Sequence, residues 1–325
     1  MPLSAHPSPR PSVPGEIPAP YREPEPGPRS DDDALQPRTH RKGGYPPLPD
    51  PLPVPVIDNH THFDIHADIH GAIHGAAPEV PIGRALDTAA AAGVAGAVQV
   101  GTDLASSRFT AAVVYQDPRL LGAVALHPNE APLLAGAGLL DDALAEIEAL
   151  AAGDRVRALG ETGLDYFRTG DSGRGSQLES FRSHIDIARR LGKALQIHDR
   201  DAHDDVVATL LADGAPDRVV LHCFSGGAEL ARRCNEQGWY MSFAGTVTFK
   251  NAANLREALL VADPALVLVE TDAPFLTPHP HRGRPNASYV MPTTVRAMAE
   301  VLGTPLETLC TRLTLNTEAV YGRWD

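Results

Sequence analysis

After Val54 the chain contains eight short apolar runs, and helix-like segments lie between them. The runs are rich in Val, Leu and Ala, and they cover residues 54–60, 93–101, 120–128, 156–164, 193–200, 218–226, 239–247 and 265–274. Near-continuous apolar strands that alternate with helices are typical of a parallel sheet whose outer face is covered by those helices. Eight such units in about 270 residues fit a closed (β/α)8 barrel.

Helical spacing of apolar residues is clear at residues 139–151, 176–191 and 251–261. An open, doubly wound sheet is the alternative, but it usually has fewer strands and a Gly-rich phosphate turn after the first strand. No G-x-G-x-x-G sequence follows Ile57. The sequence therefore favours an α/β fold of the (β/α)8 TIM-barrel type over residues 51–325.

Residues 1–50 differ in composition from the rest of the chain. More than half of the 30 prolines lie before Val56, and an acidic run (residues 31–33) and a basic run (residues 38–42) share this segment. Such a segment cannot bury enough apolar surface to offset the entropy lost on ordering. We expect a disordered, Pro-rich tail without stable packing on the barrel.

Charge and cysteine usage exclude some classes of protein. The formal net charge is −13, which argues against bulk electrostatic binding of nucleic acid but allows a local basic cleft. No apolar stretch reaches membrane-spanning length, and no signal-peptide core is found at the start. Cys223, Cys234 and Cys310 form no C-x-x-C pair, so reduced thiols in a cytoplasmic protein are expected. Neither a membrane nor an obligatory protein partner is predicted.

Side chains that bind metals follow the apolar runs. The first run leads into His60 and His62, which point to the same side because residues two apart in a strand share a face. Later runs end in His127, Glu161, His198, His222 and Asp272. Because the carboxyl ends of the strands converge on one face of a (β/α)8 barrel, these groups are expected to form one cluster.

This cluster offers more ligands than one catalytic metal needs. The six predicted ligands are His60, His62, Glu161, His198, His222 and Asp272. They fit two divalent ions, such as Mg, Mn or Zn, that share a bridging carboxylate and activate a metal-bridging hydroxide. Glu161 lies midway in the strand order and is the expected bridge. Asp272 is expected to bind metal and also to accept the proton of the attacking water, so both carboxylates are predicted to be catalytic.

At these residues the chain resembles the TatD family of metal-dependent hydrolases, a branch of the amidohydrolase superfamily. The matching stretches run from Ile57 to Gly322 in the family's order, and the tail lies outside them. They are IDNHTHFD, ALHPNE, GETGLDYF, LQIHDRDAHDD, HCFSG, MSFAGTVTFKNA, VETDAPFLTP, RGRPNASYV and LNTEAVYG.

The resemblance implies a (β/α)8 barrel with two metal sites. The first would use His60, His62, Glu161 and Asp272, and the second would use Glu161, His198 and His222. Family members described as DNases hydrolyse phosphodiester bonds, some by removing nucleotides from a 3′ end. The resemblance therefore implies a TatD-like deoxyribonuclease, 3′–5′ exonuclease-like, that acts on DNA or another phosphodiester. One stretch departs from the family pattern, because His66, His70 and His74 recur every four residues and could contact substrate, bind metal or form a polar lid.

Substrate contacts need positive or donor groups on the same loops. The predicted contacts are His127, Arg168, Arg200, Lys250 and Arg284, and the first of these could instead cap its own loop. Aromatic side chains that could stack on bases are Tyr166, Phe167, Phe224 and Phe275.

Two other functions stay open at this point. A two-metal hydrolase of the amidohydrolase type could act on a small ester or amide metabolite, and a closed, apolar pocket would favour it. A metal-binding scaffold could act through the Pro-rich tail, in which case the tail would matter more than the ligands.

Overall fold

Eight parallel strands form one sheet in the order of the sequence. The strands are β1 (Val56–Thr61), β2 (Val94–Val100), β3 (Leu120–Val124), β4 (Val156–Asp165), β5 (Ala194–Arg200), β6 (Val219–Leu221), β7 (Tyr240–Phe243) and β8 (Val267–Val269). The computed structural model describes residues 13–22, 44–65 and 80–324. Each strand coincides with one of the eight apolar runs, so the (β/α)8 barrel expected from the sequence is confirmed.

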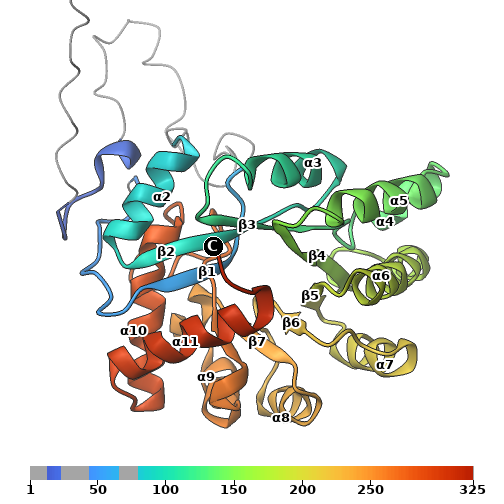
Figure 1. Cartoon of the computed structure of the whole chain (residues 1–325). Helices are drawn as coiled ribbons and strands as arrows, with labels where there is room; N and C mark the ends of the chain where they lie inside the picture. The colour runs from blue at the N-terminus through green and yellow to red at the C-terminus, as the bar shows by residue number, and fades with distance from the viewer. Residues whose placement is uncertain (1–12, 23–43, 66–79, 325) are drawn as a thin grey trace, which may run out of the picture.

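Helices surround this ring of strands (Figure 1). They are α2 (Ile82–Ala91), α3 (Leu104–Val113), α4 (Ala131–Gly136), α5 (Leu140–Ala151), α6 (Asp171–Leu191), α7 (His203–Asp213), α8 (Ala228–Gln237), α9 (Ala253–Val261), α10 (Met291–Leu302) and α11 (Leu306–Tyr321). Local sequence sets several of their ends. The Asp103 side chain accepts a hydrogen bond from the Ser106 amide at the start of α3, and α6 ends at Gly192, whose φ of 61° suits glycine.

The barrel closes between β1 and the segment that follows β8. The Asp272 amide donates to the His60 carbonyl at 2.9 Å, and the His62 amide donates to the Ala273 carbonyl at 2.8 Å. Buried Asp58 strengthens this seam by accepting hydrogen bonds from the amide and the hydroxyl of Thr271. The backbone bonds that close the barrel therefore also fix three predicted metal ligands.

Helix α11 covers the amino-terminal end of the barrel. Its Thr314 hydroxyl donates to the Pro55 carbonyl just before β1, and its Asn316 amide donates to the Val267 carbonyl at the start of β8. Val320 and Tyr321 pack inside the barrel against residues of β2, β3, β4, β5, β6 and β8. The C-terminal helix thus forms the floor of the barrel, opposite the face where the ligands gather.

Part of the predicted tail packs on the barrel, which corrects the expectation for residues 13–22 and 44–50. We call these two stretches the N-terminal segment. Tyr21, Tyr45 and Leu48 are buried, and the Tyr21 ring lies 4.7 Å from that of Tyr45 and 4.8 Å from that of Tyr289. The Leu48 amide donates to the Glu16 carbonyl, which ties the two stretches together. Average composition hid these few large apolar side chains, and the remainder of residues 1–50 lies outside the described part of the chain.

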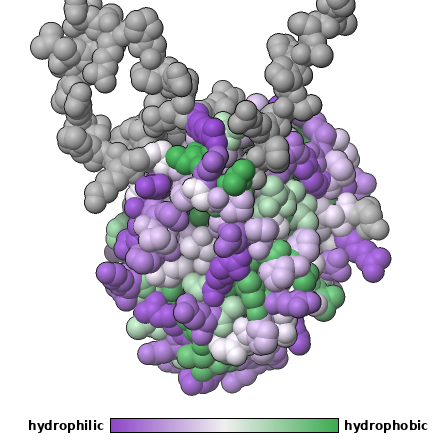
Figure 2. Space-filling model, turned by 90° about the vertical axis from the view of Figure 1, so that its left-hand side faces the viewer, coloured by the Kyte–Doolittle hydropathy of each residue, from purple (hydrophilic) through white to green (hydrophobic). Residues whose placement is uncertain are grey.

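The outer surface agrees with a barrel whose helices turn their apolar faces inward. In the view of Figure 2, hydrophilic side chains are spread widely, and apolar ones form smaller groups. No helix among the described residues is long and apolar enough to cross a membrane. The three cysteines are free thiols. His66, His70 and His74 lie outside the described residues.

Removal of residues 1–50 is expected to lower the melting temperature by about 5–10 °C. Burial of each large apolar side chain contributes roughly 1.5–3 kcal/mol, partly offset by ordering of the segment. A net loss of about 2–3 kcal/mol moves the midpoint by several degrees in a chain of this size. A chain that begins at Val13 keeps the contacts of Tyr21 and Tyr45 and serves as the control. Equal midpoints for both shortened chains, measured by calorimetry, would contradict the packing seen here.

Candidate metal centre

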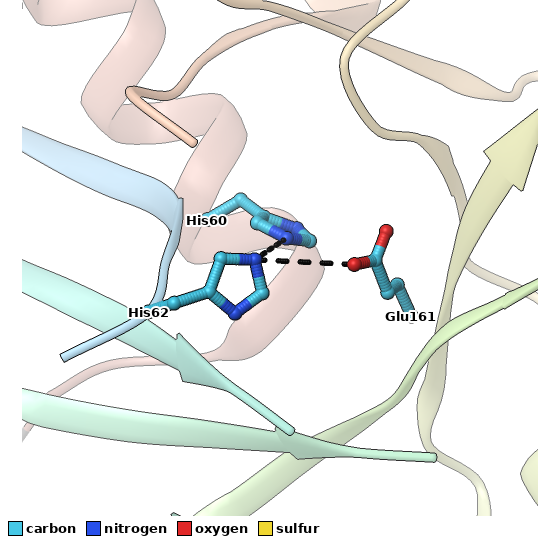
Figure 3. Close-up of side chains that lie close together, drawn as sticks. All are labelled: His60, His62 and Glu161. Atoms are coloured by element: carbon cyan, nitrogen blue, oxygen red, sulfur yellow. Dashed lines mark hydrogen bonds and ion pairs between the residues drawn. The ribbon is translucent and has the colours of Figure 1, made fainter. Parts of the chain in front are cut away.

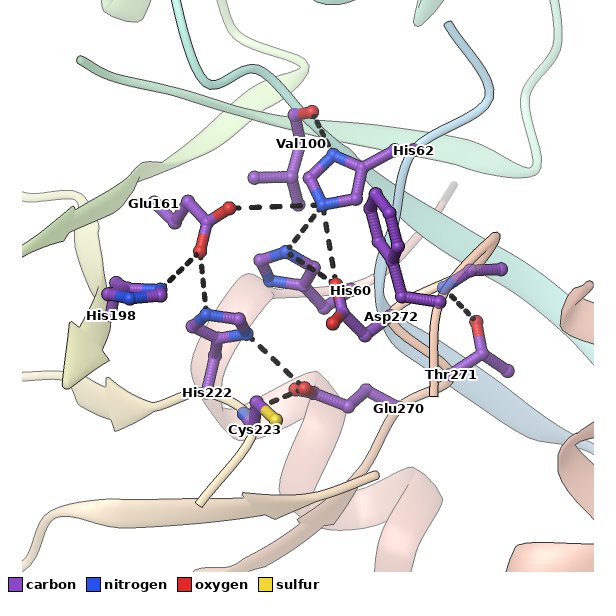
Figure 4. Close-up of polar contacts among 12 residues, drawn as sticks. His60, His62, Val100, Glu161, His198, His222, Cys223, Glu270, Thr271 and Asp272 are labelled. Atoms are coloured by element: carbon purple, nitrogen blue, oxygen red, sulfur yellow. Dashed lines mark hydrogen bonds and ion pairs between the residues drawn. The ribbon is translucent and has the colours of Figure 1, made fainter. Parts of the chain in front are cut away.

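The six predicted ligands come together at the carboxyl ends of the strands (Figure 4). Within the described residues, two compact groups of possible metal ligands share Glu161: one includes His60 and His62, and the other includes His198 and His222. Asp272 lies beside the first group and has a positive φ of 52° directly after the seam. Sequence reasoning therefore located the cluster, and five elements of the barrel supply it.

In the first group, two imidazoles and the Glu161 carboxylate point to a common centre (Figure 3), and the Asp272 carboxylate lies beside them (Figure 4). The Nε2 atoms of His60 and His62 are 3.1 Å apart. His62 Nε2 lies 3.4 Å from Asp272 Oδ1 and 3.9 Å from Glu161 Oε1, and His60 Nε2 lies 3.8 Å from Asp272 Oδ1.

The hydrogen bonds behind these rings decide which nitrogen carries a lone pair. His60 Nδ1 lies 3.1 Å from the Gln196 side-chain oxygen, and His62 Nδ1 lies 2.9 Å from the Val100 carbonyl. Both partners can only accept, so each Nδ1 donates and each neutral Nε2 presents a lone pair. Two lone pairs and two carboxylate oxygens that face one another repel unless a proton or a cation lies between them. This donor set fits a divalent metal ion with mixed nitrogen and oxygen ligands.

The second group surrounds the other oxygen of Glu161. Glu161 Oε2 lies 2.7 Å from His222 Nε2 and 3.1 Å from His198 Nδ1. His222 Nδ1 lies 3.3 Å from Glu270 Oε1, which also accepts a hydrogen bond from the Cys223 amide. Glu161 therefore directs Oε1 to one group and Oε2 to the other, which is the geometry that a bridging carboxylate requires.

Burial and neighbouring charges shift the titration of these groups. Burial opposes ionisation of Glu161, but the imidazoles of His222 and His127 hold its pKa well below the usual range. Burial also lowers the pKa of His62, yet contact with Asp272 and the charge of Glu161 raise it to about 9. For His60, burial and the nearby His222 ring hold the pKa well below its usual range. Without metal, protons would therefore occupy this cluster, and a metal ion would replace them.

A second layer of buried polar groups orients the ligands, and sequence reasoning missed it. Gln196 accepts from His60 and donates to the Asn59 carbonyl and to the Tyr321 hydroxyl, at 2.9 and 2.6 Å. Asn59 in turn donates to the Thr317 hydroxyl of α11 at 3.0 Å. A signal for Gln196 was present, because it lies two residues before His198 in an apolar run and shares its inward side.

Glu270 and Asp165 belong to the same layer. Glu270 is fully buried beside His222, and burial raises its pKa despite that imidazole. Asp165 Oδ2 lies 3.4 Å from His198 Nε2, and its Oδ1 accepts hydrogen bonds from the amides of Phe167 and Arg168. Both carboxylates directly follow or end a strand, which was the available sequence signal.

The predicted substrate residues lie on the surrounding loops. The side chains of Arg168, Arg200, Lys250 and Arg284 make no hydrogen bond or ion pair with any residue that the structure describes. The His127 ring lies 4.4 Å from that of His198, so it faces the cluster, and its Nδ1 also accepts from the Asn129 amide of its own loop. Phe224 is buried in the core and is not available for stacking on a base, which corrects that expectation.

Gln196→Leu is expected to weaken metal binding by about 10–100-fold, because His60 loses the acceptor that fixes its ring and its tautomer. The affinity can be measured by calorimetric titration of the metal-free protein with Zn or Mn. Asn316→Leu is the matched control, since this buried amide bonds to carbonyls at the other end of the barrel. Unchanged affinity in Gln196→Leu would show that His60 does not depend on this bond.

Comparisons with known proteins agree with this geometry. The sequence profile of a family described as TatD related DNase matches residues 57–322. The uncharacterised metal-dependent hydrolase TatD of Mycobacterium tuberculosis is 44% identical over 272 residues, which cover 82% of this chain and 98% of that protein. The uncharacterised metal-dependent hydrolase YabD of Bacillus subtilis is 37% identical over 204 residues, covering 62% of this chain and 77% of that protein.

A solved structure shows the same architecture. The TatD homologue YjjV of Escherichia coli superposes with a TM-score of 0.70 at 26% identity, and the match covers 82% of this chain and 98% of that one. The family match extends over most of the sequence and includes every residue of the buried His and Glu clusters. The chain therefore belongs to the TatD family of metal-dependent hydrolases.

Proposed function

We propose that this protein is a DNase-like enzyme that hydrolyses phosphodiester bonds with two divalent metal ions. The observation that carries the proposal is the position of Glu161, whose two oxygens face two separate sets of imidazoles. Family membership supports the same reaction class, because the matching family is described as DNase-related. A 3′–5′ exonuclease-like action on DNA is part of the proposal.

The metal ions would be held by His60, His62, Glu161 and Asp272 on one side and by Glu161, His198 and His222 on the other. When bound, such ions lower the pKa of a water molecule and polarise the phosphoryl group. The remaining tasks fall to side chains. Asp272 has the most accessible carboxylate of the cluster, since its side chain is 14% exposed against 8% for Glu161, so it is placed to accept the proton of the attacking water.

Cations on the loops supply the charge that a phosphodiester needs. Arg168 follows β4 and Arg200 ends β5, whereas Lys250 and Arg284 lie after β7 and β8. Because none of their side chains is paired with a carboxylate among the described residues, their charges are available to phosphate oxygens. This local arrangement offsets the net charge of −13, which would otherwise repel a polyanion.

Metal content should be close to two ions per chain at saturation. Glu161→Gln is expected to weaken binding at both sites by at least about 10-fold, because one carboxylate serves both ligand groups. Elemental analysis after dialysis and calorimetric titration measure this. Loss of a single ion, with the other bound as tightly as before, would rule out the bridging role.

Asp272→Asn tests whether the Asp272 carboxylate accepts the proton of the attacking water. Asparagine keeps the size, tolerates the positive φ at this position and retains one acceptor oxygen, but it cannot act as a carboxylate base. Turnover of a phosphodiester is expected to fall by roughly 10²–10⁴-fold, while the thermal midpoint changes little. Bound metal should be measured on the same preparation.

The substrates for this measurement are single-stranded DNA, duplex DNA and a generic phosphodiester, with Mg, Mn or Zn supplied in turn. Small esters and amides are assayed in parallel, as substrates of the alternative function. Near-normal turnover of Asp272→Asn at full metal occupancy would exclude this residue as the base. Turnover of esters or amides without any phosphodiester cleavage would overturn the proposed function itself.

A further inference from the structure

One aromatic ring near the second metal group is largely exposed to solvent. Phe167 is 64% exposed, whereas every other phenylalanine of the chain is buried or half-buried. It is the second residue after β4, on the face where the candidate ligands gather. A single exposed apolar side chain is common on a protein surface, so the position and the contacts of Phe167 carry the argument.

Arg200 holds this ring from one side. Its guanidinium carbon lies 3.9 Å from the centroid of the Phe167 ring, in cation–π geometry. The two strands fix the pair, because Asp165 and Arg200 are aligned between β4 and β5, and the Tyr166 amide donates to the Arg200 carbonyl at 2.9 Å. The result is a flat Phe–Arg platform that does not depend on loop contacts alone.

The platform is also connected to the second metal group. The amides of Phe167 and Arg168 donate to Asp165 Oδ1 at 3.0 and 2.9 Å. The other oxygen of Asp165 lies 3.4 Å from His198 Nε2 and accepts a hydrogen bond from Asn129. One buried carboxylate therefore sets the position of the exposed ring relative to a proposed metal ligand.

We propose that the Phe167–Arg200 platform binds an unpaired nucleobase of the nucleotide next to the scissile phosphate. This inference rests on the proposed phosphodiesterase function and adds a base subsite to it. A phenyl ring stacks on any base through its free face, and the guanidinium of Arg200 lies over the opposite face, where it fixes the ring and adds positive charge that attracts a polyanionic strand. A paired base inside a duplex does not expose its face to such a ring, so the subsite selects single-stranded ends.

Phe167→Ala tests the subsite by binding, with no need for turnover. The probe is a fluorescent single-stranded oligonucleotide whose 3′-terminal nucleotide carries a base or is abasic, and the readout is anisotropy. Asp272→Asn provides the background, so that the strand is not cut. Loss of one stacked base costs about 1–3 kcal/mol, which corresponds to roughly 5–150-fold weaker binding of the strand with the base. The abasic strand should bind Phe167→Ala and its Phe167 parent equally.

Two further variants separate stacking from structure. Phe167→Tyr should restore binding, because it returns an aromatic face, and Tyr115→Ala removes an exposed ring elsewhere on the surface and should change nothing. Equal loss on both strands, or no loss on either, would overturn the base subsite. Failure of the metal-loaded, unsubstituted chain to bind or cut either strand would instead overturn the proposed function.

Discussion

The main physical constraint on this structure is the mutual repulsion between lone pairs at the mouth of the barrel. His60 and His62 direct two Nε2 lone pairs to one point, and Asp272 and Glu161 direct carboxylate oxygens to the same point. Each imidazole is held in this state by an acceptor behind it, so it cannot relieve the conflict by turning or by changing its tautomer. Such an arrangement is stable only with a cation or protons inside it. The fold therefore strongly favours a positive charge between these four side chains.

The barrel supplies the rigidity that keeps these groups in place. The ligand-bearing seam between β1 and the segment after β8 is closed by backbone hydrogen bonds at His60, His62 and Asp272. Where β4 passes β5 near Glu161, a Cβ atom on Gly163 would lie 2.1 Å from the His198 carbonyl, so only glycine allows this approach. The same backbone contacts that close the sheet thus also bring the side chains of the site together.

The sequence predicted the strands and the positions of the six candidate metal ligands, because short apolar runs end in polar residues and a parallel barrel brings those ends together. It did not predict that Gln196 contacts His60, nor that the Tyr321 hydroxyl holds Gln196, since the second contact comes from a helix far away in the sequence. It also failed for the N-terminal segment. The composition of that segment is dominated by proline, which hides its few large apolar side chains. The Tyr21 ring packs against Tyr45 and against Tyr289, and Tyr289 lies far away in the sequence. Phe224 shows the same limit, because strand-end position alone does not say which way a ring turns.

The floor of the barrel has a consequence for the order of folding during synthesis. Asn59 bonds to Thr317, 258 residues later in the chain, and Gln196 bonds to Tyr321, 125 residues later. All eight strands leave the ribosome before helix α11 does, so a nascent barrel carries every candidate ligand and Gln196 but lacks the Thr317 and Tyr321 hydroxyls that hold Asn59 and Gln196. The hydrogen bonds of Asn59 with Thr317 and of Gln196 with Tyr321 form only when α11 docks. The polar layer behind His60 is therefore completed only when the last helix of the described chain joins the barrel.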